Sequence, residues 1–415
     1  MSLDLIDLRT DTARGPSGPA LRAMTAGGNT ATGDLEEYCA ALFGKESALF
    51  MPSGTVSNQV ALKVLAGRGR PVLCDAGNHL DAFDASPAAD LGGVTINAVA
   101  TPDGFLRPPV AGSDGFPSTL SATSDGFPSS PAASAGLFRS SPATTDRFSW
   151  PPAATPGGFH RSSAGAPVGL IWTENTVSAR GGRIYPLELL ADLHRWGTRH
   201  GGAVYLDGAR IMHAVAATGI APAAWGATSD AMALSVTEGL GAPMGSVLLG
   251  TAEFITAARR HRRWYGGSLR QRGPFAAAAL WALLNNSARL ADDHASARLF
   301  AAVLAESPLF TVTPPDTNIV LLDVAGVGCP PAEFVARAAD AGVRVLARRG
   351  SAVRAVFDHR TSARQARRAA ERLITVARQL KPVRPTTPAR LRWWYRIDPP
   401  HPVTVTSQMH SRTWA

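Results

Sequence analysis

The run Ser53-Gly54-Thr55 has the residue types of a phosphate-binding turn. It follows the short apolar segment 48–51, and the residues after it recur at helical spacing, so the sequence predicts a strand, a tight turn and a helix. Backbone N–H groups at a helix start, with two hydroxyls beside them, can bind a phosphate. The same residues also serve turn geometry alone at many such corners, so both interpretations stay open.

A second polar group follows another predicted strand, in the run YLDGAR. Asp207 ends that strand, and a carboxylate at the carboxyl end of a parallel strand faces the crevice where such folds bind ligands. Arg210 could bind a substrate carboxylate with two parallel hydrogen bonds. The alternatives are a helix N-cap for Asp207 and a surface salt bridge for Arg210.

His79 and the lysines complete the set of residues that could carry chemistry. His79 follows the predicted strand 71–74, where an imidazole could stack on a cofactor ring or transfer a proton, or be an ordinary loop histidine. The whole chain contains three lysines, Lys45, Lys63 and Lys381. Any chemistry that needs a lysine therefore has three candidates.

Strands alternating with helices must position these residues. The alternation predicts an α/β fold with a mainly parallel, doubly wound sheet. The predicted strands are 48–51, 71–74, 94–98, 168–173, 203–206, 231–236 and 246–249, with a clear helix at 186–200. From about residue 275 the pattern becomes helix-rich, with helices at 275–290 and 362–380 and strands at 318–324 and 343–347.

These patterns predict a large domain over 1–274, a smaller C-terminal α/β domain over 275–380 and a basic, proline-rich tail over 381–415. Residues 107–166 are rich in Ser, Pro, Ala and Gly and twice contain SDGFPS. Such a segment buries too little apolar surface to offset its ordering entropy, so we expect a disordered insertion in a surface loop.

Composition narrows the class of protein. Hydrophobic residues make up 45% of the 415 residues, enough for a large core, and the longest apolar runs are too short to span a membrane. Of the net charge of +9, +5 comes from the tail, where six Lys and Arg residues face one Asp, and no nucleic-acid reader motif accompanies it. The three separated cysteines have neither disulfide nor metal-ligand spacing, and no signal peptide is visible, so we expect a cytoplasmic protein without a metal site.

Together these motifs resemble the low-specificity L-threonine aldolases, within the aromatic-amino-acid β-eliminating lyases. The matching runs, in the family's order, are LRTDT (8–12), GKESALFMPSGTVSNQVAL (44–62), the loop around His79, TENT (173–176), YLDGARI (205–211), EGLGAPMGSVLLG (238–250) and GGSLRQRG (266–273). The resemblance implies the type I fold of enzymes that use pyridoxal 5′-phosphate (PLP), a small amino-acid substrate, and a homodimer or homotetramer with active sites at a subunit interface.

The resemblance also assigns roles by position. Ser53, Gly54 and Thr55 would hold the phosphate, and Arg270 would reach the phosphate of the neighbouring subunit. His79 would stack on the cofactor ring, and Asp207 would pair with its nitrogen. Thr10, Arg210 and Arg354 would hold the substrate carboxylate, with Thr10 in place of the family's serine.

The chain departs from the family where the cofactor is attached. The family's Schiff-base lysine directly precedes a Gly-Leu-Gly run, and here the residue before Gly239-Leu240-Gly241 is Glu238. A carboxylate cannot form the covalent link, although it can move a proton. Val177 also replaces the family's histidine after the ENT run, and the tyrosine-bearing loop is shortened to residues 30–34.

Two function classes follow. The first is a lyase with non-standard chemistry, in which noncovalently held PLP condenses directly with an amino acid and Glu238 is the acid/base; use of the aminated cofactor, or of no cofactor, belongs to the same class. The second is an inactive pseudoenzyme that serves as an oligomerisation or regulatory partner. The resemblance in the carboxylate-binding residues favours the first.

Overall fold

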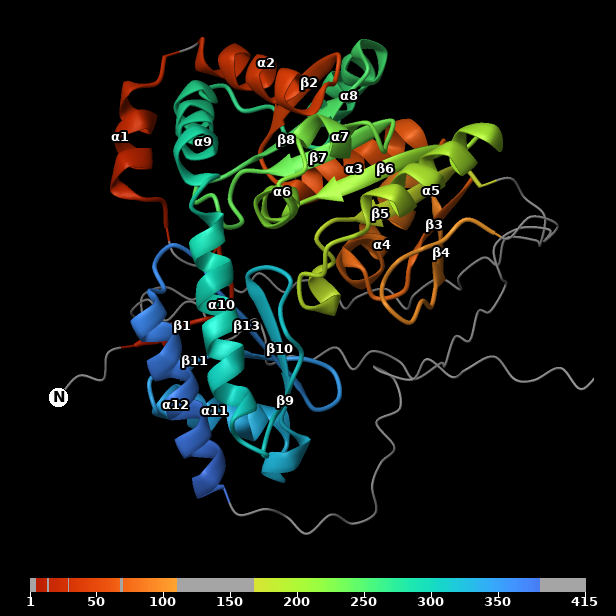
Figure 1. Ribbon diagram of the computed structural model, residues 1–415. Coiled ribbons are helices and arrows are strands. Elements are labelled where there is room, and N and C mark those ends of the chain that lie inside the picture. The colour runs from red at the N-terminus through yellow and green to blue at the C-terminus, as the bar shows by residue number, and fades with distance from the viewer. Residues whose placement is uncertain (1–4, 13–14, 29, 68–69, 110–167, 381–415) are drawn as a thin grey trace, which may run out of the picture.

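The computed structural model describes residues 5–12, 15–28, 30–67, 70–109 and 168–380. The chain forms two lobes, each built on its own sheet (Figure 1). The long helix α10 (Leu290–Ala305) runs from the large lobe into the small one. The predictions for the tail, and for all but the first three residues of the insertion, lie outside the described residues.

The large lobe contains a seven-stranded sheet in the order β2-β8-β7-β6-β5-β3-β4. Its strands are β2 (Ser47–Met51), β3 (Pro71–Asp75), β4 (Thr95–Val99), β5 (Leu170–Glu174), β6 (Ala203–Gly208), β7 (Ala231–Ser235) and β8 (Ser246–Gly250). All run parallel except β8, which is antiparallel to both of its neighbours. The predicted mainly parallel, doubly wound sheet is confirmed.

Helices cover both faces of this sheet, and its central strands are therefore continuously apolar rather than alternating. One face carries α3 (Gly54–Leu65), α8 (Ala252–Trp264), α4 (Ala85–Pro87) and the turns η1 (Leu80–Asp84) and η2 (Ala88–Gly92). The other carries α2 (Ala31–Phe43), α5 (Leu187–Arg199), α6 (Ile211–Thr218), α7 (Pro222–Gly226) and α9 (Gly273–Asn286), with α1 (Gly18–Ala26) packed on α9. A short turn, η3 (Ser178–Arg180), follows β5.

The small lobe has a second sheet in the order β12-β13-β10-β9. Its elements are β9 (Thr311–Val312), β10 (Ile319–Asp323), η4 (Ala325–Val327), α11 (Pro331–Asp340), β12 (Leu346–Ala347), β13 (Ala352–Val356) and α12 (Ala363–Gln379). The first strand of the chain, β1 (Ile6–Asp7), also belongs to this lobe, because it pairs in parallel with β11 (Val343–Arg344). The core of the small lobe thus includes residues from both ends of the described chain.

Two predicted elements are divided in the structure. The single helix expected over 275–290 is α9 followed by α10, with a break at Ser287–Arg289, where the Asn286 side chain donates to the Leu240 carbonyl at 2.6 Å. The strand expected over 343–347 is β11 and β12, which pair with different partners. The domain boundary at 274 stays a prediction, and the structure packs α9 into the core of the large lobe.

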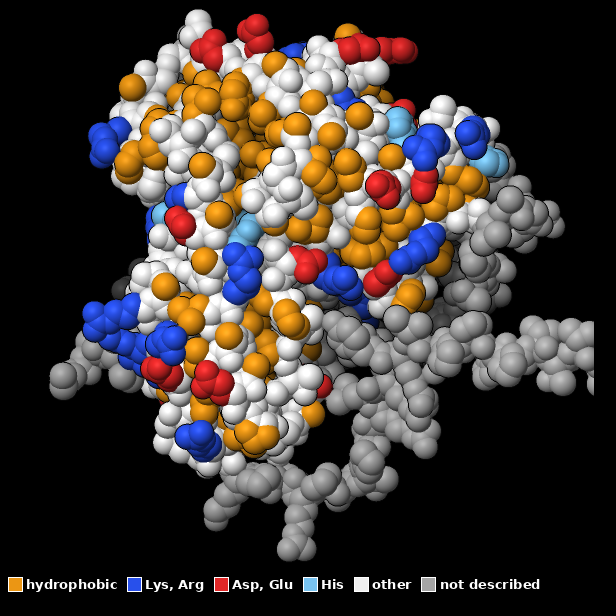
Figure 2. Space-filling model, in the orientation of Figure 1, with side chains coloured by type: hydrophobic (Ala, Val, Ile, Leu, Met, Phe, Trp, Pro, Cys, Tyr) orange, Lys and Arg blue, Asp and Glu red, His pale blue; other side chains and the backbone are white. Residues whose placement is uncertain are grey.

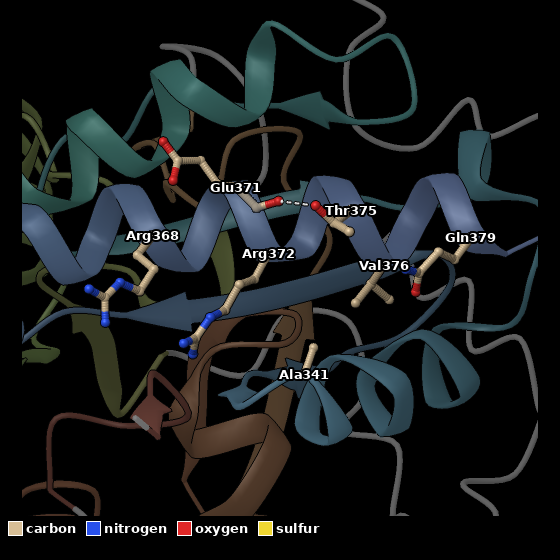
Figure 3. Close-up of a pocket in the computed structure, with 7 residues that line it drawn as sticks. All are labelled: Ala341, Arg368, Glu371, Arg372, Thr375, Val376 and Gln379. Atoms are coloured by element: carbon tan, nitrogen blue, oxygen red, sulfur yellow. Dashed lines mark hydrogen bonds between the residues drawn. The ribbon is translucent and has the colours of Figure 1, made fainter. Parts of the chain in front are cut away.

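A hollow of about 140 Å³ is lined by residues that include Asp11, Thr237 and Gly241. A hollow of about 240 Å³ lies on the small lobe, lined by Ala341 and by α12 side chains that include none of the predicted site residues (Figure 3). Hydrophobic side chains gather around α1 and α9 (Figure 2), where Leu21 and Leu284 are about half exposed. No helix among the described residues is long and apolar enough to cross a membrane, and those residues hold no cluster that could bind a metal ion.

Candidate functional site

The carboxyl ends of three neighbouring strands bring together three carboxylates. Glu174 ends β5, Asp207 lies near the end of β6, and Glu238 follows the end of β7 by three residues. His79 reaches the same edge from the loop after β3, and its backbone N–H donates to Glu174 Oε2 at 2.9 Å. Four titratable side chains therefore lie at the edge of the sheet where folds of this kind bind ligands.

Asp207 is buried and its orientation is fixed by two hydrogen bonds. Its Oδ1 accepts from the backbone N–H of Ala209 at 3.1 Å, and its Oδ2 accepts from Asn58 Nδ2 at 3.0 Å. The same Asn58 amide donates to Asp84 Oδ2 at 3.1 Å, while its oxygen accepts from the Tyr205 hydroxyl at 3.1 Å. The α6 helix begins at Ile211 without a side-chain cap, so Asp207 does not act as its N-cap.

His79 lies in a strongly acidic environment. Burial of the imidazole opposes its protonation, but the carboxylates of Asp207 and Asp84, with those of Glu174 and Glu238, outweigh this and raise the pKa of His79. The nearest of them, Asp84 Oδ2, is 3.5 Å from His79 Nε2. Burial also raises the pKa of Glu174, and the negative charge of Asp207 raises it further. His79 and Glu174 therefore both keep their protons to a higher pH than they would in water.

The Ser53-Gly54-Thr55 turn starts α3. Ser53 is the N-cap, and its Oγ accepts from the backbone N–H of Val56 at 3.2 Å. A side chain added at Gly54 would meet no atom within 4 Å, and Thr55 is exposed, so the turn is open to solvent. Asn58, which contacts Asp207, is one helical turn further along α3. The Ser53-Gly54-Thr55 turn therefore lies roughly 5 Å from Asn58 along the helix axis.

Glu238 is half-buried and held by its neighbour. The Thr237 hydroxyl donates to Glu238 Oε2 at 2.6 Å and lies 3.0 Å from Ser235 Oγ. Gly239 and Gly241 follow with φ of 69° and 77°, a backbone conformation that favours glycine. A side chain at Gly239 would also approach His213 Nε2 to 2.3 Å, which explains why a glycine follows Glu238.

The two described lysines lie away from this edge. Lys45 precedes β2 and its Nζ donates to the carbonyl of Ser229, which precedes β7, so it is at the amino-terminal edge of the sheet. Lys63 is in the last turn of α3 and donates to the carbonyls of Leu91 and Gly92. Lys381 lies outside the described residues. Among the described residues, no lysine therefore lies at the carboxyl edge of the sheet, where a covalent link to PLP would need one.

Arg210 makes a bidentate ion pair with Asp11. Its Nε and Nη2 donate to the two carboxylate oxygens at 2.9 and 2.7 Å, and the two side chains are 10% and 0% exposed. Burial opposes both charges, but each partner stabilises the other, which lowers the pKa of Asp11 and raises that of Arg210. Asn318 of the small lobe also donates to Asp11 at 3.1 Å. The alternative of a surface salt bridge for Arg210 is therefore wrong, because the ion pair is buried and links the lobes; the role of Arg210 toward a substrate carboxylate stays a prediction.

Arg354 and Arg348 lie on the small lobe, facing this pair. Arg354 is buried, with long hydrogen bonds to Ser178 Oγ at 3.4 Å and to the Arg9 carbonyl at 3.3 Å, and its Nε has no partner among the described residues. Burial, together with the charges of Arg348 and Arg210, lowers the pKa of Arg354 to about 9. Burial and the charge of Arg210 also lower the pKa of Arg348.

Within the part of the chain that the structure describes, three other positions singled out in the sequence make no hydrogen bond or ion pair with the carboxylates above. Thr10 is partly exposed and its hydroxyl contacts that of Thr12 at 3.0 Å. Arg270 is exposed between α8 and α9, so its role toward a neighbouring subunit stays a prediction. Val177 packs in the hydrophobic core of the large lobe.

Sequence reasoning missed several residues of this site. Each of them contacts a predicted residue or has a pKa shifted by its charge: Asn58, Asp84, Glu174, Asp11 and Arg348. The signal for Asn58 was available, since it is a polar residue among the apolar residues of the α3 face that packs on the sheet. Arg348 offered no such signal, because its neighbours Arg344 and Arg349 look the same in sequence and both are exposed.

Comparison with known proteins agrees with this geometry. Residues 7–326 match the family model described as beta-eliminating lyase. The chain is 32% identical to a probable low-specificity L-threonine aldolase 2 of Arabidopsis thaliana, over 86% of this chain and 93% of that protein. It is also 32% identical to the low specificity L-threonine aldolase of Escherichia coli K12, over 77% of this chain and 85% of that protein.

Solved structures share the fold at lower identity. The threonine aldolase of Leishmania major has a TM-score of 0.68 and 16% identity, covering 90% of this chain and 99% of that one. A putative aromatic amino acid beta-eliminating lyase/threonine aldolase of Exiguobacterium has a TM-score of 0.66 and 18% identity, covering 90% and 98%. The fold is therefore the PLP-dependent threonine-aldolase fold, and the chain belongs to the beta-eliminating lyase family.

Proposed function

We propose that this protein is a threonine-aldolase-like lyase that acts on a small amino acid, holds PLP without a covalent bond and uses Glu238 to move a proton at the substrate α-carbon. One observation carries the proposal: Glu238, Asp207, Glu174 and His79 meet at the carboxyl edge of the sheet, while the two described lysines are anchored elsewhere. The site keeps its acid/base groups and its ring-binding carboxylate, but has a carboxylate where its relatives would use an amine.

The residues present fit PLP at two of its three anchoring points. The open Ser53-Gly54-Thr55 turn would hold the phosphate, at a helix start where N–H groups and the helix dipole favour an anion. Asp207, oriented by Asn58 and Ala209, would pair with the ring nitrogen. When bound, PLP supplies an electron sink for the bonds at the substrate α-carbon. The third point, the covalent link, has no lysine among the described residues.

Glu238 is suited to the proton-moving role that a lysine would otherwise share. The Thr237 hydroxyl occupies Oε2, which fixes the carboxylate and leaves Oε1 to accept a proton. With Asp207 paired to the ring nitrogen, Glu238 and Glu174 would leave this edge acidic, so it would attract the amine end of an amino acid. Thr10, Arg210 and Arg354 would hold its carboxylate from the opposite side.

A titration with PLP tests this proposal. We expect saturable binding to the purified chain and a change in the cofactor's absorption spectrum when glycine or L-threonine is added. Glu238→Gln should retain binding of PLP and lose turnover by a factor of 10² or more, since a positioned acid/base contributes about 10²–10⁴-fold. Glu188→Gln is the matched control, because Glu188 is exposed on α5.

The opposite result is equally informative. If the spectrum of PLP in the presence of the protein stays that of the free cofactor up to millimolar concentration, PLP is not a ligand of this site. If both glutamine variants lose turnover equally, Glu238 has no special role.

The pseudoenzyme remains the second candidate, and the position of Val177 favours it. Val177 is 1% exposed and packs in the core. Its side chain cannot transfer a proton, unlike the histidine that the resemblance would place there. Under this alternative the chain would bind neither PLP nor amino acids, and would instead co-purify with another protein.

We also propose a homodimer or homotetramer, because the resemblance assigns Arg270, which is exposed here, to the cofactor phosphate of a neighbouring subunit. Sedimentation of the purified chain measures the assembly. Arg270→Met should then weaken PLP binding without changing the sedimentation coefficient, and an unchanged affinity for PLP would contradict the role of Arg270.

A further inference from the structure

The β12–β13 hairpin presents two arginines on one face. Leu346 pairs with Arg354 and Ala347 with Val353, and the Arg348 N–H donates to the Ala352 carbonyl at 2.8 Å. Because side chains alternate between the two faces of a strand, Arg348 and Arg354 project from the same face as diagonal cross-strand neighbours. Val353 projects from the opposite face into the core of the small lobe. The arginine face is therefore the one turned toward the large lobe, where Arg354 reaches Ser178.

This face adds positive charge to the Asp11–Arg210 pair. Arg210 is paired with Asp11 and is also stabilised by the charges of Glu238 and Glu174, whereas neither Arg348 nor Arg354 makes an ion pair among the described residues. Burial lowers the pKa of Arg354, and the positive charges of Arg348 and Arg210 lower it further. Arg348 makes no side-chain hydrogen bond or ion pair within the described chain although it is half-buried. Clustered, desolvated like charges of this kind need an anion to offset them.

One substrate carboxylate could pair with Arg354 but would leave Arg348 without an anion. A substrate with two carboxylates supplies one anion for each of these two guanidiniums. A planar guanidinium also matches a carboxylate in shape, with two parallel hydrogen bonds.

We propose that Arg348 binds a second carboxylate, so that the substrates are dicarboxylic amino acids of the aspartate type. This inference rests on the proposed function, since it takes the amino-acid site as given. The α-carboxylate contacts Arg354 and the remaining Nη1 of Arg210, and the side-chain carboxylate contacts Arg348. The amine end of the substrate then faces the edge that carries Glu238 and Glu174, so opposite ends of the ligand meet opposite charges.

Isosteric ligands provide the test. We would measure by calorimetry the Kd of L-aspartate and of L-asparagine, which differ in charge and hardly in shape, for the full chain with PLP present. We expect aspartate to bind at least tenfold more tightly, because one charge-assisted bidentate contact depends on the second carboxylate. Arg348→Met should remove that preference while changing the asparagine affinity less than twofold, and Arg348→Lys should keep part of it.

Arg349→Met is the matched control, because it removes the same charge from the next, exposed residue. The inference is overturned if asparagine binds as tightly as aspartate, or if the preference survives in Arg348→Met. Binding of glycine and asparagine without a preference for aspartate would leave the proposed amino-acid function intact and remove only this inference. If none of the three amino acids binds, both the inference and the proposed function fail.

Discussion

Replacing Arg354 with methionine should stabilise the protein in the absence of ligand. Arg354 is 9% exposed, and its only two hydrogen bonds within the described chain, at 3.4 and 3.3 Å, are long. Burial and the neighbouring guanidiniums of Arg348 and Arg210 lower its pKa to about 9. Methionine keeps the apolar stem of the side chain and removes the charge that causes this cost.

The size of the effect follows from linkage. The unfolded chain keeps this proton to a higher pH than the folded chain, so stability rises as the pH rises above about 9, and the full cost of the charge is present below that pH. The difference in pKa corresponds to about 5 kcal/mol. Lost hydrogen bonds and residual solvent screening offset roughly half, so we expect Arg354→Met to stabilise the fold by about 2 kcal/mol at pH 7.

Urea unfolding at pH 7 without added anions measures this change, with Arg349→Met as the exposed control expected to fall within about 0.5 kcal/mol of the wild type. The wild type should gain more stability than Arg354→Met when a dicarboxylate is added, because the anion relieves the same cost. If Arg354→Met is less stable than the wild type by 2 kcal/mol, the charge is already compensated and the reasoning is wrong.

Three further predictions concern other parts of the chain. Glu238→Lys should restore a covalent link to PLP, seen as cofactor that stays attached after borohydride reduction and denaturation; wild-type protein treated identically should release it. Burial raises the pKa of Asp293 to about 7, so its favourable contribution, complete below about pH 4, is lost as the pH rises through 7. Between pH 5 and 8 the wild type should therefore lose about 2 to 3 kcal/mol more stability than Asp293→Asn, and equal losses in urea unfolding would count against this. Gly226→Ala would bring its Cβ to 2.0 Å from the Phe43 carbonyl oxygen and should destabilise the fold by about 3 kcal/mol, measured as a lower Tm; an unchanged Tm would contradict the contact.

Much of the large lobe follows from local sequence. All seven strands of its sheet were predicted to within two residues of their ends, because strands buried on both faces are short apolar runs between turns. The helix start at Ser53 was also readable, since a serine N-cap before an apolar period has a local cause. Where an element depends on its neighbours, as in the division of 343–347 between two sheets, the local pattern was insufficient.

The candidate site divides in the same way. Asp207 and His79 were found because each follows a predicted strand, and the strand ends of a parallel sheet converge; Glu238 was found from the resemblance, since it stands directly before the Gly-Leu-Gly run. The partners of the predicted arginines were not found, because Asp11 lies 199 residues from Arg210 and Ser178 lies 176 residues from Arg354. Such long-range pairs are set by how the lobes dock, which no window of sequence contains.

The pairing of β1 with β11 also has a consequence for the order in which the chain can fold during synthesis. Arg9 contacts Arg354 across 345 residues, and Asp11 contacts Asn318 across 307. This segment is made before nearly all of the described chain and must therefore wait for its partners, while its apolar residues Ile6 and Leu8 stay uncovered. Closure of the arginine cluster is thus a late event in biogenesis, and a nascent chain stalled before β11 would carry the strands of the large sheet without the arginine face of the β12–β13 hairpin.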